Sequence, residues 1–200
     1  MTSSRTHAAR PDAPAAPARE RAFRGLVFIA TSLDGFIARP DGDIEWLTGR
    51  GEQAGSSADV GYDAFFAGID TLVMGRGTYE KVLTFGFWPY EGKRVAVLSG
   101  TLVTEDPNVT VHRTLDALLD ALAADGARNV YVDGGRVIQT FLREGLVDEL
   151  CLTTVPVLLG EGLPLFGATG RDIDLVHRES RVLGAGFVQH TYAIGLPGQG

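Results

Sequence analysis

The hydrophobic pattern of this chain changes period along its length. Short apolar runs bounded by turn residues are typical of strands buried on both faces. Such runs occupy residues 26–30, 70–74, 94–99, 130–132 and 148–159. Apolar residues at helical spacing predict helices, most clearly over residues 115–122 and 137–142. Residues 172–176, 179–183 and 187–194 alternate like antiparallel strands. The pattern predicts an α/β fold with a mixed sheet, parallel at first and antiparallel at the C-terminal end.

Two of the expected strands run into helices through glycine-bearing turns. One turn holds Gly134 and Gly135, and the other holds Gly75, Arg76 and Thr78. Free amides and the positive end of a helix favour an anion at such a turn, and arginine and threonine add donors for a phosphate. Each turn taken alone is equally well explained as a tight connection with nothing bound. Two of them in one domain favour a dinucleotide cleft, although neither is a Walker loop or a G-x-G-x-x-G motif.

Three further side chains are candidates for a site. Asp34 follows the first strand, where it either faces a ligand at the carboxyl end of the sheet or caps its own turn. Trp46 either packs on a ligand or fills the core. Asp63 lies on the exposed or cleft-facing side of a short helix.

Composition and charge narrow the class of protein. With 200 residues, 44% of them apolar, the chain is large enough for one domain, expected at residues 23–196. Residues 1–22 are rich in Ala, Pro and Arg and are expected to be a disordered tail. The net charge of -7, with no basic cluster outside this tail, argues against nucleic acid as a partner.

The single cysteine, Cys151, lies in an apolar run and is expected to be a buried thiol, which excludes a zinc site built on cysteines. No apolar stretch is long enough to span a bilayer, and the first residues lack a secretory signal. We therefore expect no membrane partner and no metal, and a cytoplasmic protein.

Several segments, in order, resemble one known superfamily. They are FIATSLDGFIA at residues 28–38, DTLVMGRGTYE at 70–80, the stretch at 130–166 that begins VYVDGGRVIQTF, and the closing strands. Together they resemble the dihydrofolate-reductase-like superfamily, most closely the reductase half of the riboflavin-biosynthesis deaminase-reductase and its stand-alone relatives. The resemblance implies a three-layer α/β/α fold around a mixed, mostly parallel sheet.

The same resemblance implies that NADPH lies across the carboxyl ends of the strands. The glycine turn at residues 134–135, whose peptide bond is often cis in this superfamily, would hold the pyrophosphate, and Arg76 the 2′-phosphate. Gly100 stands where many relatives carry a basic residue, so the preference for NADPH over NADH rests mainly on Arg76. The implied cofactor-binding residues are Ala30, Thr31, Gly75, Arg76, Thr78, Ser99, Gly134, Gly135, Arg136 and Val137.

For the substrate, Trp46 matches the tryptophan that follows the first strand in dihydrofolate reductases, and Thr153 matches the threonine of their Leu-Thr strand, so the resemblance implies that both bind substrate. The catalytic acid implied by the resemblance is Asp34 in the riboflavin branch or Asp63 in the dihydrofolate reductases, where its spacing is about one helical turn short. Phe28 and Phe36 stand where that riboflavin branch carries basic residues, which argues against a phosphoribosyl substrate.

The expected function is hydride transfer from NADPH to a small pterin-like or pyrimidine-like heterocycle. One alternative is a true dihydrofolate reductase. Another is a non-catalytic nucleotide-binding module, which would be favoured if Asp34 and Asp63 could both be replaced without effect. A zinc deaminase is excluded because its His/Cys/Cys ligand set has no counterpart beside one cysteine. Relatives commonly pair as homodimers through the C-terminal strands, so we expect a homodimer.

Overall fold

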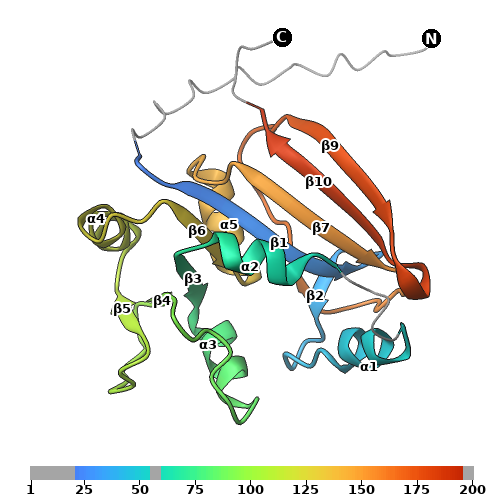
Figure 1. Cartoon of the computed structure of the whole chain (residues 1–200), viewed down its shortest axis with the longest axis horizontal. Coiled ribbons are helices and arrows are strands. Elements are labelled where there is room, and N and C mark those ends of the chain that lie inside the picture. The colour runs from blue at the N-terminus through green and yellow to red at the C-terminus, as the bar shows by residue number, and fades with distance from the viewer. Residues whose placement is uncertain (1–20, 55–59, 196–200) are drawn as a thin grey trace, which may run out of the picture.

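An eight-stranded mixed sheet forms the centre of the computed structural model, which describes residues 21–54 and 60–195 (Figure 1). Its strand order is β5-β4-β3-β6-β1-β7-β10-β9. Neighbours from β5 to β7 pair in parallel, whereas β10 and β9 add antiparallel pairs at one edge. The strands are β1 (Arg24–Ser32), β3 (Thr71–Gly75), β4 (Arg94–Leu98), β5 (Thr110–His112), β6 (Asn129–Asp133), β7 (Glu149–Val155), β9 (Leu175–Val182) and β10 (Val188–Ile194).

Helices lie on both faces of this sheet, as Figure 1 shows for α2 and α5. The described helices are α1 (Glu45–Ala54), α2 (Tyr62–Gly68), α3 (Arg76–Leu83), α4 (Leu115–Ala124), α5 (Gly135–Arg143) and the short η2 (Gly184–Gly186). A small ribbon pairs β2 (Phe36–Ala38) with β8 (Leu163–Pro164) outside the main sheet.

Successive side chains of the central strands point to opposite faces of the sheet and pack into two separate hydrophobic cores. In β3, Val73 packs into the core under α4 and α5, whereas Leu72 and Met74 pack into the core under α2 and α3. Both sets are fully buried, which explains why the sequence of this strand reads as a continuous apolar run. The layered α/β architecture expected from the sequence is confirmed.

The sheet parts at its centre, between β1 and β6. Their pairing runs only over Arg24–Leu26 and Asn129–Tyr131, whereas β1 stays paired with β7 as far as Ser32. Beyond this point the Tyr131 hydroxyl donates a hydrogen bond of 2.9 Å to the carbonyl oxygen of Phe28. The carboxyl ends of β1 and β6 therefore open a gap where the strand order of the sheet reverses, the usual location of ligands in open α/β sheets.

One detail of the sequence prediction was wrong. Residues 172–176 and 179–183 were expected to form two strands, but β9 is a single strand that crosses this break. All eight of its residues are exposed, so no burial pattern marks its length. Strand β7 ends at Val155, just before Pro156, where the sequence predicted a bend.

The predicted tail at residues 1–22 lies outside the described residues except for Arg21 and Ala22. The Arg21 guanidinium donates to the carbonyl oxygen of Leu146 and to the carboxylate of Asp148, each at 2.8 Å. None of the helices in the described ranges is long and apolar enough to cross a membrane.

Candidate functional site

The two glycine turns lie side by side at the carboxyl edge of the sheet. Met74 of β3 pairs with Asp133 of β6, so Gly75 and Gly134 follow at the same level. Gly134 has a φ of 88°, and a Cβ on it would collide with the hydroxyl oxygen of Thr78. The backbone of one turn therefore packs against the first turn of the helix that follows the other. The Gly134–Gly135 peptide bond is trans, so the cis bond implied by the resemblance is not present.

A cavity of about 800 Å³ opens beside these turns. Four residues predicted from the sequence line it: Ala30, Thr78, Gly134 and Thr153. Ala30 and Gly134 come from the two sides of the gap between β1 and β6, so the cavity fills this gap. Such a volume is large enough for a nicotinamide ring and a small substrate ring together.

Asp133, the last residue of β6, places a carboxyl group inside the cavity. Burial raises the pKa of this carboxyl from 3.8 to about 6, although the hydrogen bond of 2.8 Å that Asp133 accepts from the Gly134 amide acts in the opposite direction. A carboxyl with this pKa can hold or release a proton near neutral pH. The sequence prediction missed Asp133, although an acidic residue at the end of a buried strand, directly before a glycine turn, is a usable signal.

Aromatic side chains form a large part of the cavity wall. Phe28, Tyr62, Tyr90 and Tyr131 line the cavity. The ring of Phe28 meets that of Tyr62 edge-on, with centroids 5.7 Å apart. Burial and the nearby charge of Asp133 raise the pKa of Tyr62 to about 12 and also raise the pKa of Tyr90, so both phenols stay protonated at physiological pH. The cavity thus combines aromatic walls and phenol groups with the carboxyl of Asp133, whose pKa is raised.

A second group of polar residues lies outside this cavity, around the turn at residues 99–101 that follows β4. Arg113 donates a hydrogen bond of 2.6 Å to the carbonyl oxygen of Gly100, and Arg76 lies 3.4 Å from the hydroxyl of Thr101. Two guanidinium groups from separate elements therefore border one three-residue turn. The Arg76 guanidinium is also paired with Glu80 at 2.7 Å, an exposed contact within α3.

Comparison with known proteins identifies the family of this arrangement. The model of the RibD C-terminal domain matches residues 25–189. The chain belongs to the RibD C-terminal domain family. The resemblance predicted from the sequence is thereby confirmed at the level of the family, which is of the reductase type.

Individual proteins are similar to this RibD-type domain over most of its length. An uncharacterized protein, YwjB of Bacillus subtilis (strain 168), is 38% identical over 146 residues, which cover 70% of this chain and 81% of YwjB. The crystal structure of a candidate riboflavin biosynthesis protein from Shewanella sp. PV-4 matches with a TM-score of 0.78 and 37% identity, covering 87% of this chain and all of that one.

A dihydrofolate reductase from Enterococcus faecalis, solved with NADP(H), has the same fold at a TM-score of 0.64. The match covers 88% of this chain and 98% of that one, at 16% identity. The dihydrofolate-reductase-like fold class is therefore confirmed.

Within this RibD-type domain, Asp34 does not line the cavity. Its carboxylate accepts hydrogen bonds from the Ser32 hydroxyl at 2.6 Å and from the amides of Leu159 at 3.1 Å and Gly160 at 2.8 Å. These donors, the Ser32 hydroxyl first, hold the pKa of Asp34 below its usual value. Asp34 thereby ties the turn after β1 to the segment after β7.

The other predicted site residues fall into two groups. Trp46, Thr31 and Val137 are buried, and the indole Nε1 of Trp46 has no hydrogen-bond partner within the described part of the chain. Asp63 and Arg136 are exposed and do not line the cavity.

Two further predicted residues have contacts of their own. A Cβ on Gly135 would lie 2.8 Å from the carbonyl oxygen of Pro164, so the backbone of this glycine turn packs directly on β8. The Ser99 hydroxyl accepts from the amides of Thr101 and Leu102, and so shapes the turn bordered by the two arginines.

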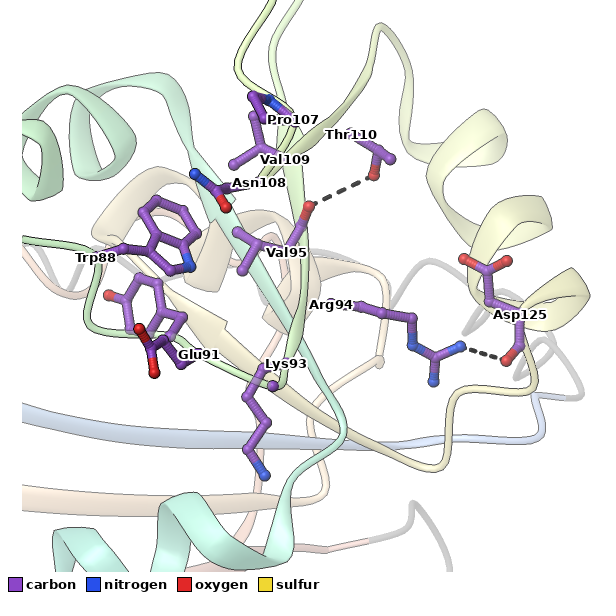
Figure 2. A pocket seen from close by; sticks show the side chains of 12 residues that line it. Trp88, Glu91, Lys93, Arg94, Val95, Pro107, Asn108, Val109, Thr110 and Asp125 are labelled. Carbon is purple, nitrogen blue, oxygen red and sulfur yellow. Dashed lines mark hydrogen bonds between the residues drawn. The ribbon is translucent and has the colours of Figure 1, made fainter.

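Figure 2 shows a different hollow, of about 710 Å³, near the amino end of β4. Its cations are already held by the protein: Lys93 donates to the carbonyl oxygen of Ile69 at 2.6 Å, and Arg94 to that of Asp125. None of the predicted site residues lines it. Among the residues that the structure describes, no group of three or more His, Cys, Asp or Glu side chains could hold a metal ion.

Proposed function

We propose that the chain is an NADPH-dependent reductase that transfers a hydride to a pterin-like or pyrimidine-like heterocycle. Membership of a reductase-type family supports this proposal at the level of chemistry. The observation that carries it is the cavity that joins the glycine turn at Gly134, Thr78 and the carboxyl of Asp133. A turn able to hold a dinucleotide and a group able to hold a proton then face the same space.

The described residues fit a 2′-phosphorylated dinucleotide. Arg76 and Arg113 would bind the 2′-phosphate beside the turn at residues 99–101, and Arg113 compensates for the glycine at position 100. A Cβ on Gly77 would meet no atom within 4 Å, so the backbone at the start of α3 is open to a close approach by a phosphate. Thr78 and Gly134 would contact the pyrophosphate, and Ala30 the nicotinamide.

When bound, NADPH supplies the hydride and the protein supplies orientation, exclusion of water and a proton. The aromatic wall formed by Phe28 and Tyr62 excludes water from the place where a substrate ring would lie. We assign the proton to Asp133 rather than to Asp34 or Asp63, because Asp133 alone of these three lines the cavity. Removing a positioned general acid typically costs about 10²- to 10⁴-fold in rate, which sets the loss expected for Asp133→Asn.

The first test is a titration with NADPH and with NADH, followed by nicotinamide fluorescence. We expect NADPH to bind more tightly than NADH, and Arg76→Ala and Arg113→Ala each to weaken NADPH binding by about 1.5–3 kcal/mol while changing NADH binding little. Arg143→Ala is the matched control, since Arg143 contacts Thr140 at the far end of α5. Failure of wild type to bind either nucleotide would overturn the reductase proposal.

A true dihydrofolate reductase is less well supported, because Asp63 does not reach the cavity. A non-catalytic nucleotide-binding module would bind NADPH yet show no turnover that depends on Asp133. The expected homodimer and cytoplasmic location are retained as parts of the proposal.

A further inference from the structure

We propose that the substrate is a flat ring without a phosphate group, which stacks on the aromatic side chains of the cavity and directs amino groups carried by the ring at Asp133. This inference deepens the proposed function and rests on it, because it concerns the substrate end of the same cavity. The proposed substrate differs from a phosphoribosyl compound, the substrate class that would ordinarily be tested first on a reductase domain of this family.

The charges around the cavity disfavour a phosphate. Its described lining holds three carboxylates, from Asp41, Glu80 and Asp133, and one ammonium group, from Lys81. Arg76 and Arg113 do not line it and lie instead at the turn assigned to the cofactor. Because Glu80 is paired with Arg76, a phosphate on the substrate would face the carboxylates of Asp41 and Asp133 against the single ammonium group of Lys81, which is still more negative than positive charge.

The walls fit a flat ring. Phe65 packs edge-on against Tyr131 with centroids 5.0 Å apart, and the rings of Phe28, Phe65 and Tyr62 all contact one another. These contacts fix the aromatic side chains, so little conformational entropy is lost when a ring stacks on those that face the cavity. The phenols of Tyr62 and Tyr90 are protonated and therefore add polar groups but no charge.

Asp133 has spare capacity to accept donors. Its Oδ1 accepts the Gly134 amide at 2.8 Å, and within the described residues Oδ2 has no hydrogen-bond partner. Asp133 is largely buried and lines the cavity. An amino group carried by the ring is a donor that pairs well with such a carboxylate, because the bond is charge-assisted.

The experiment compares three probes by isothermal titration calorimetry at pH 8, with and without saturating NADPH. 2,4-Diaminopteridine presents two amino groups. Lumazine has the same ring system and keeps ring N–H groups, but carbonyl oxygens replace the amino groups, so the comparison isolates the amino donors. Uridine 5′-monophosphate carries a ring and a phosphate. We expect wild type to bind the diaminopteridine at least about tenfold more tightly than lumazine, the ratio that a charge-assisted hydrogen bond provides. Uridine 5′-monophosphate should bind most weakly.

Asp133→Asn should remove most of the preference for the diaminopteridine. Asp63→Asn changes an exposed carboxylate that does not line the cavity and serves as the control that should keep the preference. Equal binding of diaminopteridine and lumazine by wild type, or tighter binding of uridine 5′-monophosphate, would overturn the inference without any variant being needed.

The outcomes separate this inference from the proposed function. If NADPH binds, but the protein does not prefer the diaminopteridine to lumazine with or without NADPH, the reductase proposal stands and the substrate class is wrong. If the preference is present but neither nucleotide binds, the ring pocket stands and the reductase proposal falls.

Discussion

Asp133 combines a buried position with a group that ionises in the neutral range. Its pKa is raised from 3.8 to about 6, so the folded protein holds a proton there that the unfolded chain releases. The stabilisation that comes from this proton is fully present below about pH 4 and is lost as the pH rises through 6. Ionised Asp133 therefore lowers the free energy of unfolding by about 3 kcal/mol above pH 7.

This shift predicts a pH dependence that one variant removes. Urea unfolding between pH 4.5 and 7.5 should show wild type losing stability as the pH rises, whereas Asp133→Asn should be nearly flat over this window and more stable at its upper end. Asp63→Asn, which changes an exposed carboxylate, should keep the slope of wild type. Identical slopes for wild type and Asp133→Asn would show that another group is responsible.

Asp34 illustrates the opposite role for a carboxylate. Because it accepts hydrogen bonds from Ser32, Leu159 and Gly160, Asp34→Ala should lower the melting temperature, measured by circular dichroism. The affinity for NADPH should be retained, since Asp34 does not line the cavity. A variant that melts like wild type but has lost turnover would instead assign Asp34 to catalysis.

The residues of the site were predictable only where a local pattern marks them. Gly75 and Gly134 each follow an apolar run. They lie close together because their strands, β3 and β6, are adjacent and parallel. Arg113 is a single arginine before a helix, and only tertiary packing brings it to the turn at residues 99–101. Tyr90 is a single tyrosine in a loop, and only tertiary packing brings it to the cavity. Trp46 matches a motif, yet it packs with Val155 and Phe187 in a separate small core.

At the scale of elements, the contact between the two glycine turns predicts a contrast between two glycines. Gly134→Ala forces an alanine into a φ of 88° and against Thr78, and should lower the free energy of unfolding by about 1–3 kcal/mol. Gly77 lies in helix α3, and a Cβ added there would meet open space. Gly77→Ala should therefore raise the free energy of unfolding by up to about 1 kcal/mol. Urea unfolding of both variants at one pH measures the difference.

A double variant separates the collision with Thr78 from the backbone strain in the loss of stability expected for Gly134→Ala. Adding Thr78→Ala to Gly134→Ala removes the hydroxyl in the way and should recover part of the stability, leaving the backbone strain. No recovery would mean that the unfavourable φ accounts for the whole effect.

Elements with a buried face were predictable and those without one were not. Strand β3 and helix α4 have buried apolar side chains at the expected spacing, and both match their predictions closely. In β9 every residue is exposed, so its pattern was interrupted at His177 and Arg178 although the strand continues through them.

At the scale of the whole molecule, β9 leaves a long edge of the sheet uncovered. Its Val182 is 82% exposed, and Leu175 and Val176 are exposed as well. If the proposed homodimer forms through this edge, Val182→Lys should shift the molar mass measured by light scattering from dimer towards monomer. Val103→Lys is the matched control, because Val103 is also 82% exposed but follows β4 near the opposite edge of the sheet. A monomeric wild type would reject the dimer.

The short pairing of β1 with β6 divides the main sheet into two plates of four strands, joined near Leu26 and Tyr131 by three residue pairs. We predict that these pairs act as a hinge and that the angle between the plates sets the width of the cavity. A bound molecule that bridges Ala30 and Gly134 would hold this angle fixed. We therefore expect slower amide hydrogen exchange at the hinge pairs when the cavity is filled, even though no ligand touches them.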